Sequence, residues 1–119
     1  MAFARVTSLQ PGFPDSELVT IEADITNGTL YAFTVVGLAG KAVGEARDRM
    51  SSAIKFSGFQ SPKSHNHKIV ISLAPADLKK EGTVFDLPMA LAYLLANEEI
   101  SFDPKGIVLM GELALDGTL

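Results

Sequence analysis

The sequence predicts one domain of the mixed α/β (α+β) class, in which a mixed sheet packs against two main helices. Three segments predict this class. Over residues 19–26 apolar side chains alternate with polar ones, as they do along a half-buried strand. Over residues 41–56 they recur at helical spacing, and residues 87–96 are apolar nearly all round, which is typical of a core helix. With 119 residues, of which 47% are hydrophobic, the chain suffices for one such domain and one core.

The N-terminal third predicts three strands. The first is expected over residues 3–9, because the Pro and Gly residues that follow it force a loop. Asn27-Gly28 ends the alternating segment with two residues that tolerate positive φ, so we expect a tight hairpin turn there. The more apolar residues 30–36 are then the returning strand, central in the sheet.

The middle of the chain predicts a helix followed by a central strand. The helix is expected over residues 41–56 and to end at Gly58, which suits the left-handed conformation that closes a helix. After a polar loop, Ile69, Ile71 and Leu73 mark a strand with apolar residues on both sides, which favours a central position. The residues expected on the core face of the helix are Val43, Ala46, Met50, Ala53 and Ile54.

The last third predicts the core helix, one more strand and a turn. Asp86 is expected to cap the helix, with Pro88 as its second residue. Residues 107–110 predict a strand, and Asp116-Gly117 predicts a second hairpin turn. Because a hairpin turn with only one strand is an odd terminus, we expect residues 1–119 to be a single N-terminal domain of a longer protein.

Composition and charge narrow the classes of function. The net charge of −4 gives the domain no general positive field for nucleic acid, although seven basic residues of the middle third form either a local patch or a mixed-charge surface. They are Arg47, Arg49, Lys55, Lys63, Lys68, Lys79 and Lys80. No apolar run approaches the roughly 18–20 residues that cross a bilayer, and the absence of cysteine fits a reducing compartment. We expect a cytoplasmic protein with no membrane partner.

Glycine, histidine and carboxylate motifs lack the spacing that catalytic or metal chemistry requires. Gly37 to Lys41 has two residues between its glycines, whereas a nucleotide phosphate loop has four. His65 and His67 have no third ligand at a diagnostic spacing. Asp77, Glu81 and Asp86 are each explained by capping or loop solvation, and no nucleophile elbow is present. We therefore expect no catalytic, cofactor-binding or metal residue in this chain.

Four aromatic residues offer two interpretations. They are Tyr31, Phe33, Phe56 and Phe59. Exposed rings can stack on the bases of single-stranded nucleic acid. Their position within apolar periodic segments or beside a helix end favours core packing instead.

Three blocks of sequence, in order and covering most of the chain, carry a family resemblance. They are Val36-Gly37-Leu38 with residues 42–49 and Ser57-Gly58-Phe59; residues 73–82 with residues 85–88; and residues 111–117. These blocks resemble the N-terminal, ChlI-type domain of magnesium-chelatase-like AAA+ ATPases of the ComM (YifB) competence-protein type. One departure is Ala39-Gly40, where that family usually has Pro-Asp or Pro-Glu.

The resemblance implies a fold and a cellular role. The fold would be like that of ribosomal protein S5 domain 2, which the catalytic domain of Lon protease shares. An AAA+ module that binds ATP and Mg would follow residue 119, and the whole protein would be a hexamer that remodels DNA by branch migration during natural transformation. Partners of this domain would be its own AAA+ module, further copies of the chain and DNA. The residues expected to contact DNA or a partner are Arg47, Arg49, Lys79 and Lys80.

A comparison with Lon predicts that the domain is not a peptidase. Laying the Gly-Pro-Ser-Ala-Gly nucleophile turn of Lon on residues 80–86 puts Val84 at the serine position, and valine has no hydroxyl to attack a carbonyl. We expect a non-catalytic domain that supports assembly or DNA engagement by the motor. Two alternatives stay open: a residual or alternative hydrolase on the Lon-like scaffold, and a pure packing and oligomerisation module.

Overall fold

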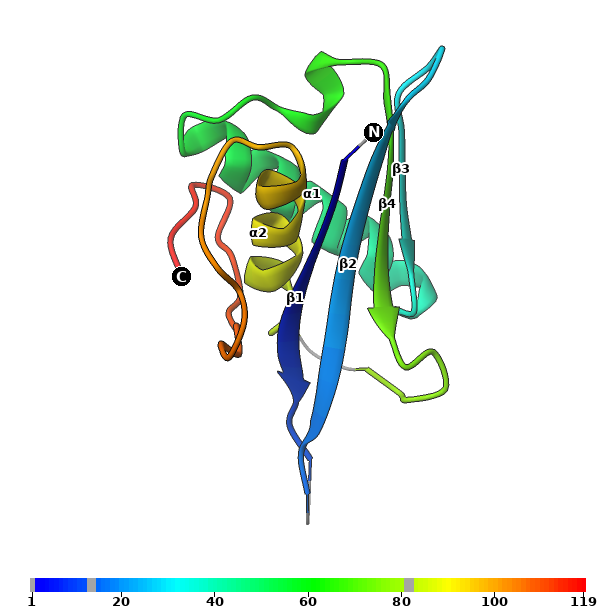
Figure 1. Cartoon of the computed structure of the whole chain (residues 1–119), viewed down its shortest axis with the longest axis vertical. Coiled ribbons are helices and arrows are strands. Elements are labelled where there is room, and N and C mark those ends of the chain that lie inside the picture. Colours follow the sequence, from blue (N-terminus) through cyan, green and yellow to red (C-terminus); the bar gives the residue numbers. More distant parts are fainter. Residues whose placement is uncertain (1, 13–14, 81–82) are drawn as a thin grey trace.

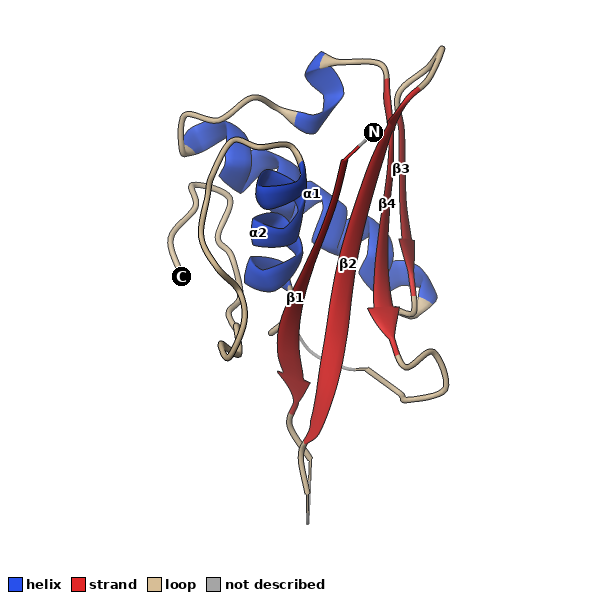
Figure 2. Ribbon diagram, in the orientation of Figure 1, coloured by secondary structure: helices blue, strands red, loops and turns tan. Residues whose placement is uncertain are grey.

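A computed structural model of the chain describes residues 2–12, 15–80 and 83–119. It contains a four-stranded sheet with two helices on one face (Figures 1 and 2). The elements are β1 (Ala2–Gln10), β2 (Glu17–Asn27), β3 (Ala32–Val36), α1 (Gly40–Phe56), the 3-10 helix η1 (Pro62–Ser64), β4 (His67–Ala74) and α2 (Asp86–Ala96). The predicted α/β class, with a mixed sheet and two main helices, is confirmed. Of the helices in the described ranges, none has the length and apolar composition to span a bilayer.

The order of strands in the sheet corrects one prediction. The order is β1-β2-β4-β3, with β2 antiparallel to both neighbours and β3 parallel to β4. The predicted hairpin between β2 and β3 is therefore wrong, and β3 lies at an edge instead of the centre. The N–H of Gly28 donates to Asn66 O at 2.9 Å, so the turn after β2 meets the chain just before β4. The chain from β3 to β4 crosses through α1, which is the connection that a parallel pair needs.

Alternate residues of the strands form the sheet side of the core. Val6, Ile21, Val35 and Ile71 are all buried. Val6 lies opposite Ile21 on β2, and Val35 lies opposite Ile71 on β4. The central position of β4 is confirmed, but its second face is only partly buried, because both helices cover the same side of the sheet. The opposite face of the sheet carries mostly polar side chains, together with exposed apolar ones such as Phe3, Leu18 and Val36.

Both helices form where the sequence predicts them. Ala46, Met50, Ala53 and Ile54 of α1 are buried as expected, whereas Val43 is only partly buried. Gly58 has φ of 90°, and the N–H groups of Gly58 and Phe59 donate to Lys55 O and Ile54 O. These two bonds are the Schellman arrangement that ends a helix.

The predicted cap of α2 is wrong. Phe85 is its N-cap and makes no side-chain capping bond, Asp86 is the first helical residue, and Pro88 is the third. The Asp86 carboxylate does not cap the helix because it binds groups from two other parts of the chain, described below. The expectation that α2 is the core helix is confirmed, since most of its residues are buried.

The C-terminal segment contains a turn but no strand. Residues 107–110 make only a single parallel bridge, Val108 to Thr7 of β1, so the predicted strand is wrong. Ile107, Val108 and Met110 are exposed, and a segment without a buried face lacks the burial that stabilises a strand. The Asp116-Gly117 turn is confirmed, because Gly117 has φ of 89° and Ala114 N donates to Thr118 O at 2.8 Å.

Replacing Gly37 by alanine is expected to destabilise the fold. Gly37 has φ of 92°, and a Cβ there would lie 2.2 Å from Leu73 O. We expect Gly37→Ala to lower the free energy of unfolding by about 2 kcal/mol or more, measured by urea denaturation. The matched control is Gly44→Ala in α1, where a Cβ meets open space; it should raise stability by about 0.5–1 kcal/mol. Equal effects of the two substitutions would contradict this assignment.

Tyr93 is expected to make stability depend on pH in the alkaline range. Burial is the main cause that raises the pKa of Tyr93 from 10.0 to about 12, and Glu99 and Tyr31 add to it. The pKa is higher in the folded state, so this contribution is complete below pH 10. Between pH 10 and 12 stability should fall by about 1.4 kcal/mol per pH unit. Urea denaturation of Tyr93→Phe should lack this component, and identical pH profiles for the two proteins would disprove it.

Candidate functional site

The four basic residues predicted to contact DNA or a partner do not form one patch. Arg47 and Arg49 lie on α1, whereas Lys79 and Lys80 lie in the loop after β4, and together they line three separate hollows. Arg47 Nη1 donates to Phe33 O at 2.8 Å. Lys80 is only 5% exposed, and its Nζ donates to Pro75 O at 2.5 Å and to Leu78 O at 2.9 Å. Lys79 is exposed. The buried Lys80 ammonium thus links two backbone carbonyl groups of the loop after β4.

The Asp86 carboxylate joins three distant parts of the chain. Arg49 approaches it with two parallel bonds, Nε to Oδ2 at 2.6 Å and Nη2 to Oδ1 at 3.0 Å. The backbone N–H of Leu113 donates to Oδ2 at 3.2 Å. Asp86 is 1% exposed, and the hydrogen bond to it is the main reason that the pKa of Arg49 is raised. We call this arrangement the Asp86 junction; it ties α1, the start of α2 and the C-terminal segment together.

Backbone pairing extends the Asp86 junction on either side. Gly111 N donates to Val84 O at 2.8 Å, and Leu87 N donates to Gly111 O at 2.9 Å. The Thr83 hydroxyl donates to the Glu112 carboxylate. Val84, laid on the nucleophile position of Lon, packs its side chain partly buried against the core. We call the loop between β4 and α2 (residues 75–85) the organising loop; its residues 81 and 82, which include the candidate Glu81, lie outside the described residues.

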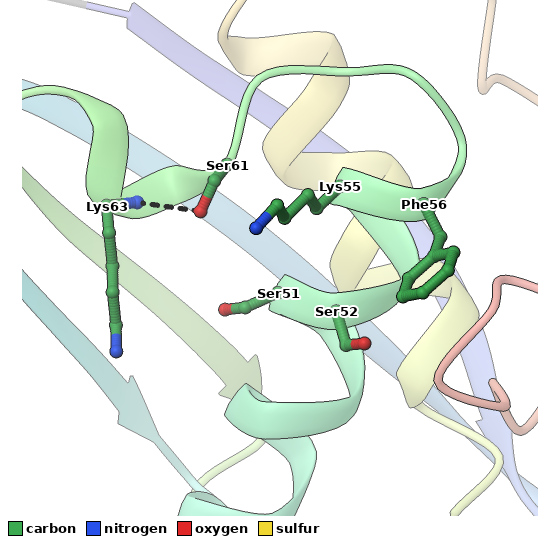
Figure 3. Close-up of a pocket in the computed structure, with 6 residues that line it drawn as sticks. All are labelled: Ser51, Ser52, Lys55, Phe56, Ser61 and Lys63. Atoms are coloured by element: carbon green, nitrogen blue, oxygen red, sulfur yellow. Dashed lines mark hydrogen bonds between the residues drawn. The ribbon is translucent and has the colours of Figure 1, made fainter.

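One hollow lies between the C-terminal half of α1 and the loop that carries η1 (Figure 3). We call it the serine–lysine cleft; its volume is about 630 Å³, and it is lined by Ser51, Ser52, Lys55, Phe56, Ser61 and Lys63. A neighbouring hollow of about 470 Å³ shares Ser51 and Lys63 and adds Tyr31, Arg47 and Asp48. No carboxylate from the described part of the chain lines the serine–lysine cleft itself.

The groups in the serine–lysine cleft are donors of hydrogen bonds. Within the described ranges, the ammonium groups of Lys55 and Lys63 have neither an ion pair nor a hydrogen bond. Ser52 Oγ donates to Leu115 O at 2.8 Å, and Ser61 Oγ accepts from Lys63 N at 3.4 Å. A hollow with cations and hydroxyls but no lining carboxylate from the described residues suits an anion.

Phe56 lies at the surface, which corrects the expectation of core packing. It is 70% exposed, whereas Phe33 is buried and Phe59 and Tyr31 are partly buried. Phe56 follows Met50 by six residues, about 240° around a helix, so it faces away from the core. That angle is the signal in the sequence that separates Phe56 from the other aromatic residues. Sequence reasoning also missed the serines of the cleft, because η1 brings Ser61 to α1 through a non-local contact.

The remaining sequence candidates lie just before and at the start of β4, in the turn before α1 and in the loop after β4. The His65 and His67 rings stack with their centroids 5.2 Å apart, and the described residues contain no group of three His, Asp or Glu that could hold a metal ion. Residues 37–41 lead into α1, whose N-cap is Ala39. Asp77 is exposed on its loop.

Comparisons with known proteins match most of the chain. The sequence model of the family described as "Subunit ChlI of Mg-chelatase" matches residues 21–119. A protein named YifB of Salmonella typhimurium is 50% identical over 102 residues, which is 85% of this chain and 19% of that protein. Competence protein ComM of Haemophilus influenzae is 42% identical over 100% of this chain and 23% of its own length, and an uncharacterized protein of Mycobacterium bovis is 38% identical over 98% and 23%. The chain therefore spans about a fifth of the length of these relatives.

Breaking the Asp86 junction should cost more stability than breaking the exposed ion pair on the sheet. Arg49→Met leaves the buried Asp86 carboxylate without its cation, and we expect a loss of about 2–4 kcal/mol in the free energy of unfolding. The control Arg5→Met removes the partner of Glu22, whose ion pair is largely exposed; it should cost less than about 1 kcal/mol. Urea denaturation of both variants measures the difference. Losses of similar size would show that the junction does not hold the fold.

Proposed function

Because this chain belongs to the ChlI family of Mg-chelatase subunits and has relatives named ComM and YifB, we propose that it is a non-catalytic domain that helps an attached AAA+ motor to assemble or to engage DNA. The observation that carries the proposal is the match along this whole chain to a competence protein of which it spans 23%. In this proposal ATP and Mg bind in the motor, which lies outside residues 1–119. The whole protein is a cytoplasmic hexamer that acts in DNA branch migration.

The Asp86 junction supports a structural role for the organising loop. Arg49, Asp86 and Leu113 come from the three sequence blocks that carry the family resemblance, and all three meet at one carboxylate. We further propose that the fold is of the ribosomal protein S5 domain 2 type and related to Lon. In that relationship, the position of the protease nucleophile has become a packing position, occupied by Val84.

Exposed apolar side chains support a role in assembly. Several gather in the C-terminal segment, where a soluble domain alone gains nothing from them: Ile107, Val108, Met110, Leu115 and Leu119. Exposed apolar side chains that form a contiguous surface are typical of contacts with another module or another copy of the chain, and we propose that these do so. The segment thus offers the domain a surface for packing in the assembled protein.

One contact favours the alternative of a hydrolase on the same scaffold. The Thr83 hydroxyl donates to the Glu112 carboxylate, which places a nucleophile type beside a base type. Peptide cleavage by the chain that is lost in Thr83→Ala and retained in Thr83→Ser would favour this alternative. The packing of the partly buried Val84 against the core and the structural use of Asp86 favour the non-catalytic domain.

Measurements on the 119-residue chain and on the longer protein test the leading proposal. We expect ATP hydrolysis by the longer protein and none by the chain alone, because the motor supplies the ATPase site. Deletion of residues 1–119 should weaken either hexamer formation, measured by light scattering, or DNA binding, measured by fluorescence anisotropy. Robust ATPase activity of the chain alone, or a deletion that leaves both properties unchanged, would overturn the proposal.

A further inference from the structure

The serine–lysine cleft joins a donor-lined hollow to an exposed aromatic ring (Figure 3). We propose that this cleft binds single-stranded DNA, with Lys55 and Lys63 holding phosphates and Phe56 stacking on a base. The inference rests on the DNA engagement proposed above and gives it a site. The site differs from the four basic residues that the sequence suggests, of which only Arg47 adjoins it.

The charges of the cleft differ in sign from those of the chain as a whole. The chain has a net charge of −4, yet the cleft contains two ammonium groups and no lining carboxylate from the described residues. Lys55 comes from α1 and Lys63 from η1, so the two cations stand on different walls of the hollow. Lysine ammonium and serine hydroxyl groups are common donors to phosphate oxygens. The cleft can therefore hold a phosphate between two elements.

The neighbouring hollow extends the same surface. It shares Ser51 and Lys63 with the cleft and adds the guanidinium of Arg47, with Asp48 as its one lining acid. A strand lying along both hollows would pass Lys55, Lys63 and Arg47 in turn. This arrangement suits a chain of successive phosphates better than a single small anion.

The last carbonyl groups of α1, which lie near the cleft lysines in the sequence, accept hydrogen bonds from the chain that follows the helix. The carboxyl end of a helix carries partial negative charge on carbonyls that lack partners. In α1 the carbonyls of Ala53, Ile54 and Lys55 accept bonds from the N–H groups of Ser57, Phe59 and Gly58, respectively. These carbonyls are therefore not left without a hydrogen-bond partner beside the two lysines.

Phe56 is what indicates a single strand. Its ring is 70% exposed, and it lines the same cleft as Lys55. Stacking on an aromatic side chain needs an open base face and tolerates any base. In a duplex those faces are covered by neighbouring base pairs, so the ring favours single-stranded DNA.

Fluorescence anisotropy with a labelled 20-nucleotide single strand of mixed sequence tests the cations. We expect Lys55→Ala/Lys63→Ala to weaken binding at least ten-fold and to reduce its dependence on salt, because two phosphate contacts are lost. The matched control, Lys68→Ala/Lys105→Ala, removes the same charge from exposed positions elsewhere and should change the affinity less than two-fold. Equal losses in both double variants would overturn the assignment to this cleft.

Substitutions of Phe56 test the stacking. Phe56→Ala should weaken binding about five-fold or more with the salt dependence unchanged, whereas Phe56→Trp should retain the affinity. Because the ring is exposed, urea denaturation should show little change in stability for either variant. An alanine variant that binds as well as the unsubstituted chain, or a duplex bound as tightly as the single strand, would overturn the proposal.

These outcomes separate this inference from the function proposed above. If the chain does not bind the single strand at all, the cleft is not a DNA site, whereas the role of the domain in assembly is judged by deletion in the longer protein. If the chain binds the strand and the cleft variants bind equally well, DNA engagement stands and this site falls.

Discussion

The buried carboxylate of Asp86 is the interaction on which the arrangement of this domain depends. A buried charge is costly unless cations and N–H groups satisfy it, and Asp86 receives two bonds from Arg49 and one from Leu113 N. Its partners fix α1 against α2 and hold the C-terminal segment beside them. One carboxylate thus joins residues that lie far apart in the sequence.

Local sequence patterns predict most helices and strands of this fold, but they do not predict the order of the strands in the sheet. The periods of β2 and α1 are visible in the sequence because each depends on residues a few positions apart. Two interactions between distant residues could not be predicted from such patterns. Strand β3 pairs with β4 across the whole of α1, and Asp86 binds Arg49, 37 residues away, instead of capping its own helix. A local turn signal such as Asn27-Gly28 cannot reveal that another strand lies in between.

The candidate sites likewise combine features that the sequence shows with features that only the structure shows. The sequence identifies Arg49 and Lys80 as basic, but it does not show that Asp86 and two loop carbonyls take up their charges. Phe56 and Lys55 are visible on the polar side of the helical period, whereas their neighbours Ser61 and Lys63 reach the same hollow only through the fold of the following loop. Residue type was predictable, and the surroundings that decide its use were not.

The bond from Ser52 to Leu115 has a mechanical consequence. Ser52 lines the serine–lysine cleft, and Leu115 belongs to the segment that Asp86 holds through Leu113. Leu113 and Leu115, two residues apart, are therefore anchored at two different places, one at the first residue of α2 and the other at the wall of the cleft. This double anchorage restrains the C-terminal segment against both helices, although the segment forms no strand of the sheet.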